Sequence, residues 1–403
     1  MRRAYRSAPL TGIATAIAIA ATTAASASRA ASPSGSEEAG WLRAGGERAW
    51  SERAAGGVRG LTVGPIESLR HPGRGYGSEA YGRSLDEAKA MGATWISLTP
   101  FGRVWSLQSS AVSLEFEAPF EENRANIVRA IRMAHARGLR VLLVPHLWVE
   151  AGGWRAEIDP GSDEGWAAWA ESYRSFLLTW AEVARETGAE MLSVGVELRS
   201  WVTTARVTSF RAIIADVREA YPGLLTYSAN WDDVDYTAIL QDIDLIGINA
   251  FYPLADEEGA PLSALMKGGE RVAEKLSTLA RTEKKPILLT EIGYKTVESP
   301  AVKPWVWPED MKRVVLSERD QAEATFALVQ PLLDQPWFAG FFVWRIYADP
   351  DDVSQEPEFG FSPRGKLSER VVRDAFTAIW AADGDRALLT PIGRQRATTQ
   401  GLF

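Results

Sequence analysis

The sequence predicts a single (β/α)8 barrel, the TIM-barrel fold, and three observations support this fold class. Eight β-rich runs alternate with amphipathic stretches that have the period of an α-helix. The centres of these runs lie about 40 residues apart on average, enough for one strand and one helix per unit. Runs such as 141–144 and 287–289 are apolar throughout, as expected when both faces of a parallel sheet are buried.

The folded domain is predicted to span residues 58–382, in strand and helix order along the chain. The predicted strands are 58–64, 94–99, 139–148, 190–197, 224–231, 243–251, 286–294 and 338–347. The predicted helices include 126–137, 166–186, 209–221, 270–282, 319–333 and 368–380. Glycines at 92, 138 and 188 close several helical stretches, as helix C-termini favour. A doubly wound open sheet is the competing fold, but no G-x-G-x-x-G turn follows a strand.

The N-terminal residues have the composition of a secretory signal peptide. Three arginines precede an Ala-, Ile- and Thr-rich run, no acidic residue occurs before Glu37, and Ala25-Ser26-Ala27 fits a cleavage site. We therefore expect a signal peptide at 1–27, a flexible lead-in at 28–57 and a peripheral tail at 383–403, with secretion or residence in the periplasm or cell envelope. A retained membrane anchor is the alternative, but the run is short for a span. Sec and twin-arginine export both stay open.

Charge and cysteine content exclude several classes of function. The formal charge is −8 and no basic cluster is visible, which argues against a nucleic acid partner. The chain has no cysteine, which excludes a disulfide, a thiolate metal site and a cysteine nucleophile. Three histidines without H-x-x-x-H or H-E-x-x-H spacing give no metal site, and no G-x-S-x-G elbow follows a strand. We expect no metal and no organic cofactor.

Two glutamates, Glu197 and Glu291, end the fourth and seventh predicted strands. Catalytic groups of such barrels lie at the carboxyl ends of the strands, and a pair of carboxylates there is what glycoside hydrolysis requires. If the strands alternate regularly, Gly195 and Ser193 share the inward face with the first, and Leu289 and Ile287 with the second. A single glutamate at a strand end is more often a helix cap or a surface ion-pair partner.

Polar and aromatic residues at the other strand ends suggest a carbohydrate cleft, because tryptophan faces stack on sugar rings. Eight of the 16 tryptophans follow predicted strands, although core packing is the usual fate of tryptophan. They are Trp105, Trp148, Trp154, Trp201, Trp231, Trp305, Trp307 and Trp344. Further candidates for substrate contact are His146, Asn230, Asn249, Tyr252 and Tyr294.

Four segments together resemble glycoside hydrolase family 113. They are Ser193-Val194-Gly195-Val196-Glu197-Leu198, Leu289-Thr290-Glu291-Ile292-Gly293-Tyr294, Ile96-Ser97-Leu98-Thr99-Pro100-Phe101 and Val343-Trp344. The resemblance covers most of residues 60–380. That family belongs to a large clan of retaining (β/α)8 hydrolases and is best known for β-mannanases.

The resemblance implies a role for each matching residue. It makes Glu197 the acid/base and Glu291 the nucleophile, places Tyr252 beside the nucleophile, and puts Trp344 under the reacting sugar. Many clan members have Asn directly before the acid/base to hold the sugar 2-hydroxyl, whereas this chain has Val196. Asn230, Asn249 and His146 are then the candidates for that hydroxyl.

We expect a retaining hydrolase that cleaves β-1,4-linked mannan-type polysaccharides or oligosaccharides. The carboxyl groups should lie about 5 to 5.5 Å apart, with Glu197 protonated and Glu291 ionised at the working pH. The alternatives are a hydrolase of another β-linked hexosan in the same clan, and a noncatalytic carbohydrate-binding barrel. The sequence leaves open the sugar, endo versus exo action, and the oligomeric state.

Overall fold

The computed structural model describes residues 57–66, 71–116, 118–306, 310–311, 313–333, 335–351 and 357–379. The predicted signal peptide at 1–27, the lead-in at 28–57 apart from Gly57, and the tail at 383–403 lie outside these residues. The limits of the domain therefore stay a prediction, while the elements between them can be compared with the structure.

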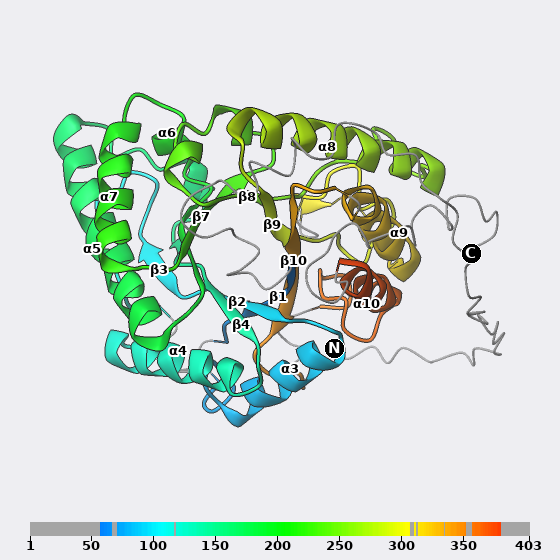
Figure 1. Ribbon diagram of the computed structural model, residues 1–403, viewed down its shortest axis with the longest axis horizontal. Helices are drawn as coiled ribbons and strands as arrows, with labels where there is room; N and C mark the ends of the chain where they lie inside the picture. The colour runs from blue at the N-terminus through cyan, green and yellow to red at the C-terminus, as the bar shows by residue number, and fades with distance from the viewer. Residues whose placement is uncertain are drawn as a thin grey trace, which may run out of the picture.

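A closed barrel of eight parallel strands forms the centre of the protein (Figure 1), which confirms the predicted fold class. The barrel strands, in chain order, are β1 (Val58–Gly64), β2 (Trp95–Leu98), β4 (Arg140–Leu143), β6 (Met191–Val196), β7 (Leu224–Asn230), β8 (Leu245–Asn249), β9 (Ile287–Ile292) and β10 (Phe338–Tyr347). Strand β10 pairs with both β1 and β9 and so closes the ring.

Helices surround the ring of strands and cover its outer face, as Figure 1 shows. They are α3 (Glu79–Ala90), α4 (Phe120–His135), α5 (Asp163–Thr187), α6 (Arg199–Val202), α7 (Val207–Ala220), α8 (Leu262–Glu283), α9 (Glu318–Val329) and α10 (Leu367–Ile379), with 3-10 turns η1 (Arg155–Glu157), η2 (Val234–Tyr236), η3 (Leu240–Asp242) and η5 (Gln330–Leu332). No helix within the described ranges is both long enough and apolar enough to span a membrane.

Two short strands outside the barrel, β3 (Phe101–Val104) and β5 (His146–Val149), pair with each other in a separate two-stranded sheet. The single strand predicted at 139–148 is therefore two strands. Pro145 lies between them and donates no backbone hydrogen bond, which favours the break. This small sheet extends from the carboxyl ends of β2 and β4 and carries two of the candidate residues, His146 and Trp148.

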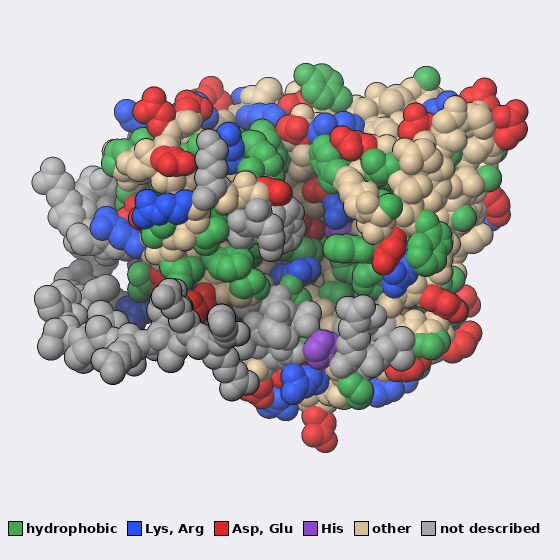
Figure 2. Space-filling model, turned by 180° about the vertical axis from the view of Figure 1, so that it is seen from behind, with side chains coloured by type: hydrophobic (Ala, Val, Ile, Leu, Met, Phe, Trp, Pro, Cys, Tyr) green, Lys and Arg blue, Asp and Glu red, His purple; other side chains and the backbone are tan. Residues whose placement is uncertain are grey.

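The barrel interior holds one apolar cluster, the interior cluster, to which every barrel strand contributes. Its members are Val58, Trp95, Leu142, Val144, Met191, Val196, Leu224, Leu245, Leu288, Ala339 and Phe342. A larger apolar core lies between the strands and the helices. The acidic and basic side chains on the face seen in Figure 2 are interspersed rather than gathered by sign.

Regular strand alternation does not explain how either glutamate reaches the cleft. In β6, the register shifts between Ser193 and Val196, and Val196 belongs to the interior cluster. A Cβ on Gly195 would meet the Tyr173 hydroxyl on the outer side of the sheet. The prediction that Gly195 shares the inward face with Glu197 is therefore wrong, because the irregularity changes the phase of the strand.

The same correction applies to β9. Leu288 belongs to the interior cluster, whereas Ile287 and Leu289 belong to the outer core under the helices. Register shifts occur on both sides of this strand near its carboxyl end, where Glu291 aligns with Asn249 of β8. Irregular pairing at a strand end redirects a side chain without disturbing the regular pairing below it.

Candidate active site

The carboxyl ends of the barrel strands surround a cleft of about 870 Å³. Both candidate glutamates line it, together with basic, amide and aromatic side chains. The complete lining is His146, Leu147, Trp148, Val149, Gly152, Gly153, Trp154, Arg155, Glu197, Asn230, Trp231, Asp232, Phe251, Glu291, Pro304, Trp305, Trp344 and Phe361. The cleft is large enough for several sugar rings.

Glu197 directly follows β6 and lies in the left-handed backbone region, with a φ of 51°. This conformation is uncommon for a residue with a Cβ and tends to occur at functional sites. Its buried carboxylate accepts three hydrogen bonds. Trp154 Nε1 lies 2.8 Å and Arg155 Nη1 2.5 Å from Oε2, and Asn249 Nδ2 lies 2.9 Å from Oε1.

Glu291 lies near the end of β9 and is 7% exposed. Burial raises the pKa of its carboxyl group to about 8, and the negative charge of Glu197 adds to the shift. The charges of Arg155 and Arg345 and a hydrogen bond with the Asn249 side chain act in the opposite direction. The free protein therefore favours a protonated Glu291. This contradicts the expectation that Glu291 is ionised, because burial penalises its charge more than the nearby cations favour it.

Asn249 connects the two glutamates from the end of β8. Its amide nitrogen donates to Glu197, and its amide oxygen accepts a hydrogen bond from Thr290 Oγ1 at 3.0 Å. The side chain is 1% exposed and does not line the cleft. Asn249 is therefore placed to orient the carboxylates, whereas a direct contact with the sugar 2-hydroxyl would require it to be accessible.

His146 and Asn230, the other two candidates for the sugar hydroxyl, both line the cleft. Burial holds the pKa of His146 well below its usual range, with the charge of Arg155 contributing, so its ring is neutral at neutral pH. The ring lies 4.5 Å from that of Phe101 and 6.4 Å from that of Trp344. Asn230 Nδ2 donates to Asp232 Oδ1 at 2.6 Å.

Five of the eight tryptophans predicted at the mouth line the cleft: Trp148, Trp154, Trp231, Trp305 and Trp344. Trp105 is 62% exposed but lies outside the lining, and Trp307 lies outside the described residues. The placement of Trp201 at the mouth is wrong. It belongs to helix α6, is 1% exposed, and packs against Phe210 at 4.9 Å in the outer core.

Tyr252 is buried, and its ring packs 5.5 Å from that of Trp231. Its hydroxyl has no hydrogen-bond partner among the described residues, so no such bond joins it to Glu291. Besides burial, the charges of Asp235, Asp232 and Asp233 raise its pKa. The place beside the nucleophile that the resemblance implies for Tyr252 stays a prediction.

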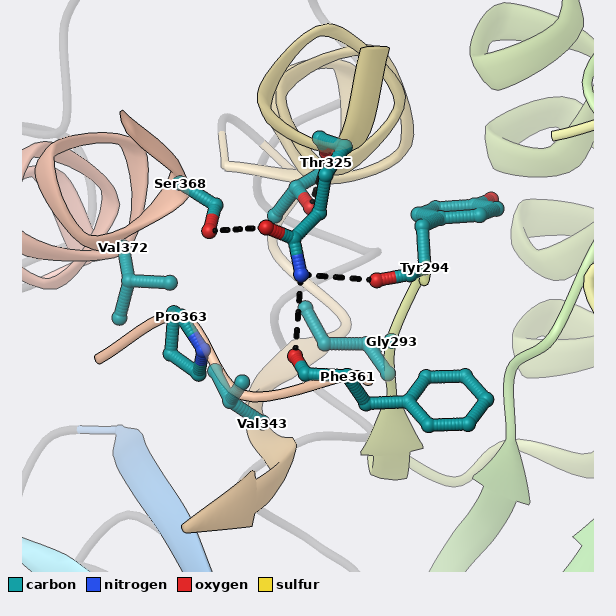
Figure 3. Close-up of a pocket in the computed structure, with 10 residues that line it drawn as sticks. Gly293, Tyr294, Thr325, Val343, Phe361, Pro363, Ser368 and Val372 are labelled. Carbon is teal, nitrogen blue, oxygen red and sulfur yellow. Dashed lines mark hydrogen bonds between the residues drawn. The ribbon is translucent and has the colours of Figure 1, made fainter. Parts of the chain in front are cut away.

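Tyr294 is buried and does not line the cleft, and its hydroxyl donates to the Tyr252 carbonyl at 2.8 Å. Its backbone borders a separate cavity of about 10 Å³ (Figure 3), where Gln321 Nε2 donates to the carbonyls of Tyr294 and Phe361. Ser368 Oγ donates to the same amide group from α10. Tyr294 thus supports the loop behind the cleft, and its prediction as a substrate contact is wrong.

Arg155 is a cleft residue that the sequence did not indicate. It lies in the turn after β5, 42 positions before its partner Glu197. Nothing in the spacing of Gly152-Gly153-Trp154-Arg155 indicates this ion pair. Trp154, by contrast, was expected at the mouth, and its hydrogen bond to Glu197 places it there. Within the described ranges, no group of three acidic or histidine side chains could hold a metal ion.

Residues 70–361 match the model of Glycoside Hydrolase Family 113. Among solved structures, the GH113 β-mannanase AaManA from Alicyclobacillus acidocaldarius, in complex with ManMIm, is 27% identical with a TM-score of 0.68; the match covers 81% of this chain and 98% of that chain. A GH113 β-1,4-mannanase complex is 22% identical with a TM-score of 0.68, over 80% and 99% of the two chains.

A Glycoside Hydrolase Family 5 mannosidase from Rhizomucor miehei shares the fold at lower similarity. It is 13% identical with a TM-score of 0.55, and the match covers 80% of this chain and 92% of that chain. No curated protein matches the chain.

Proposed function

Because the chain belongs to Glycoside Hydrolase Family 113 and is a glycoside hydrolase, we propose that it cleaves β-1,4-linked mannan-type polysaccharides with retention of anomeric configuration. The observation that carries this proposal is the pair of buried glutamates in an aromatic cleft. Asn249 lies between them, hydrogen-bonded to Glu197 and aligned with Glu291 across β8 and β9. The negative charge of one raises the pKa of the other, so they act as one coupled pair.

In this proposal Glu197 is the acid/base and Glu291 the nucleophile. Glu197 protonates the departing glycosidic oxygen while Glu291 attacks the anomeric carbon and forms a glycosyl ester. Glu197 then removes a proton from the water that hydrolyses the ester. The first step needs one proton on the pair, and the raised pKa of Glu291 supports a proton held there before substrate binds. Positive charge that develops on the sugar beside Glu291 favours transfer of that proton to Glu197.

The positions of the tryptophans favour cleavage within a chain. A line between Glu197 and Glu291 divides the strand order of the barrel, with β7 and β8 on one side and β10, β1, β2 and β4 on the other. Trp231 follows β7 and stacks on Trp305 at 5.4 Å. Trp148 lies in the sheet beyond β4, on the other side. Platforms on both sides suit an internal cutter, whereas an exo-acting enzyme needs one closed pocket.

Mannan is the favoured substrate because the AaManA structure, 27% identical over 81% of this chain, is that of a β-mannanase. A hydrolase of another β-linked hexosan is the second candidate, since Val196 cannot form the hydrogen bond made by the usual clan Asn. We also propose that the enzyme acts outside the cytoplasm, because residues 1–27 have the composition of a signal peptide.

A panel of defined β-linked oligosaccharides tests the proposal. Mannopentaose, cellopentaose and xylopentaose are incubated with the wild type and with Glu291→Ala, and the products are separated. Fast cleavage of mannopentaose at internal bonds, absent in the variant, is expected. If cellopentaose were cleaved faster than mannopentaose, the substrate would be a β-glucan instead of a mannan. If the wild type bound all three sugars without cleaving any, the protein would be a carbohydrate-binding barrel.

A further inference from the structure

Every hydrogen bond to the Glu197 carboxylate comes from an N–H donor, within the described part of the chain. Guanidinium and indole groups donate but cannot accept hydrogen bonds. Arg155 and Trp154 both donate to Oε2, and the ion pair with Arg155 is largely shielded from water because the Glu197 side chain is 9% exposed. The Glu197 carboxylate is therefore the acceptor in each of these contacts, and two donors fix one of its oxygens.

The two donors are themselves held in place. Arg155 Nε donates to the Leu147 carbonyl at 3.3 Å, which ties the guanidinium to strand β5. The Arg199 guanidinium lies 4.6 Å from the centre of the Trp154 ring and forms an ion pair with Asp233 at 3.0 Å. Trp154 and Arg155 each have a second contact besides Glu197. They therefore hold the Glu197 carboxylate in a defined orientation.

We propose that Arg155 is a positioning residue for the second half of the reaction, in which it holds Glu197 as the carboxylate that activates water. This inference rests on the proposed retaining function. In the glycosyl-enzyme intermediate Glu291 is an uncharged ester, and Glu197 must be ionised to act as a base. The geometry around Glu197 suits this role, because three N–H groups donate to its carboxylate and none accepts from it.

The step itself is a hydrolysis. Water attacks the anomeric carbon, the Glu197 carboxylate takes one proton from that water, and a new C–O bond forms. The bond between the anomeric carbon and Glu291 breaks, and its electron pair leaves Glu291 as a carboxylate. The free sugar departs, and the proton on Glu197 is then available for the next glycosidic oxygen.

The first half makes the opposite demand on Glu197. Its proton must reach the leaving group, and the Arg155 guanidinium cannot accept a hydrogen bond from that proton. A substrate whose leaving group needs no protonation avoids this step altogether. Loss of Arg155 also removes a cation that favours the ionised form of Glu291, so the first half should slow slightly. The second half, which depends on Glu197 as a base, should slow much more, a separation that general loss of structure would not give.

The experiment compares Arg155→Met with the wild type on 2,4-dinitrophenyl β-mannobioside and 2,4-dinitrophenyl β-cellobioside, so that a wrong sugar assignment does not hide the effect. Arg206→Met is the matched control. Arg206 also pairs with a carboxylate, that of Asp163 at 3.2 Å, and lies 4.8 Å from the Trp166 ring, but it does not line the cleft. Burst amplitude, kcat and KM are measured with and without azide.

For Arg155→Met we expect kcat and KM to fall together, by roughly 10- to 100-fold, while kcat/KM falls much less. One equivalent of dinitrophenolate should appear in a burst, and azide, which needs no general base, should restore kcat. Arg155→Lys keeps a cation and should show a smaller loss, and it gives the same readout if Arg155→Met does not fold. Arg206→Met should match the wild type.

An equal fall in kcat and kcat/KM, or no recovery with azide, would overturn the role of Arg155 while leaving the retaining assignment in place. The anomer released first by the wild type is followed by NMR in the same experiment. Release of the α-anomer would overturn the proposed function itself, and with it the role of Arg155.

Discussion

Replacement of Glu291 by glutamine should stabilise the protein, and the gain should depend on pH. The buried carboxyl has a pKa of about 8 in the folded protein, against 4.5 for an exposed glutamate. Its folded form therefore binds a proton that the unfolded chain releases above pH 4.5. Stability is lost as the pH rises from 4.5 towards 8, because the folded state holds more protons than the unfolded state in that interval.

Each unit of difference between the pKa in the folded protein and the pKa in the unfolded chain corresponds to about 1.36 kcal/mol. The buried carboxyl costs the folded protein about 1 kcal/mol at pH 5 and about 3 kcal/mol at pH 7. Glutamine has nearly the same shape and no charge to bury. The stability of Glu291→Gln relative to the wild type should then increase by about 2 kcal/mol between pH 5 and pH 7.

Urea denaturation followed by tryptophan fluorescence at both pH values measures this difference. Glu182→Gln is the control, because Glu182 is exposed on α5 with a side chain 58% accessible. Its stability relative to the wild type should not change with pH. The reasoning is refuted if Glu291→Gln is less stable than the wild type at pH 7, or if its advantage is the same at pH 5 and pH 7.

Three further predictions concern activity. Glu291→Ala should abolish turnover of every substrate. Glu197→Ala should still cleave dinitrophenyl glycosides, and azide should rescue its second step. Equal loss of activity on natural and activated substrates, without rescue by azide, would refute the assignment of Glu197. Asn249→Ala should lower kcat/KM roughly 100-fold on short and long substrates alike, and a loss confined to long substrates would instead make Asn249 a remote binding residue. Trp148→Ala and Trp305→Ala should lower kcat/KM more for mannohexaose than for mannotriose, whereas Trp201→Ala should cost about 3–5 kcal/mol of stability and leave that ratio unchanged. Steady-state kinetics on both oligosaccharides and urea denaturation test this pair, and a chain-length effect of Trp201→Ala would contradict its place in the core.

The barrel and the two glutamates were predictable because they depend on local patterns. Apolar strands alternate with amphipathic helices, and a carboxylate at the end of a buried strand lies at the catalytic face of such a fold. The orientation of the glutamates was not predictable from alternation. The register shifts beside Val196 and Glu291 change the phase of the strands, and a single sequence gives no sign of such a shift.

Trp201 and Arg155 show two further limits of local patterns. Trp201 lies four positions after Glu197, so a strand-based argument places it at the mouth. The chain turns there into helix α6, whose inner face packs on Phe210. Arg155 reaches Glu197 across 42 positions from a turn without regular periodicity. Contacts of this kind depend on how loops fold over the barrel, and strand and helix periodicity do not encode them.

Covalent trapping tests the central claim most directly, namely that Glu291 forms a glycosyl ester. A 2-deoxy-2-fluoro-β-mannosyl fluoride has a good leaving group, while its fluorine slows hydrolysis of the ester, so the intermediate accumulates. Mass spectrometry of the intact protein and of its peptides should show one fluorosugar bound to Glu291 and none in Glu291→Ala. A label on another residue, or inactivation without any covalent label, would contradict the account.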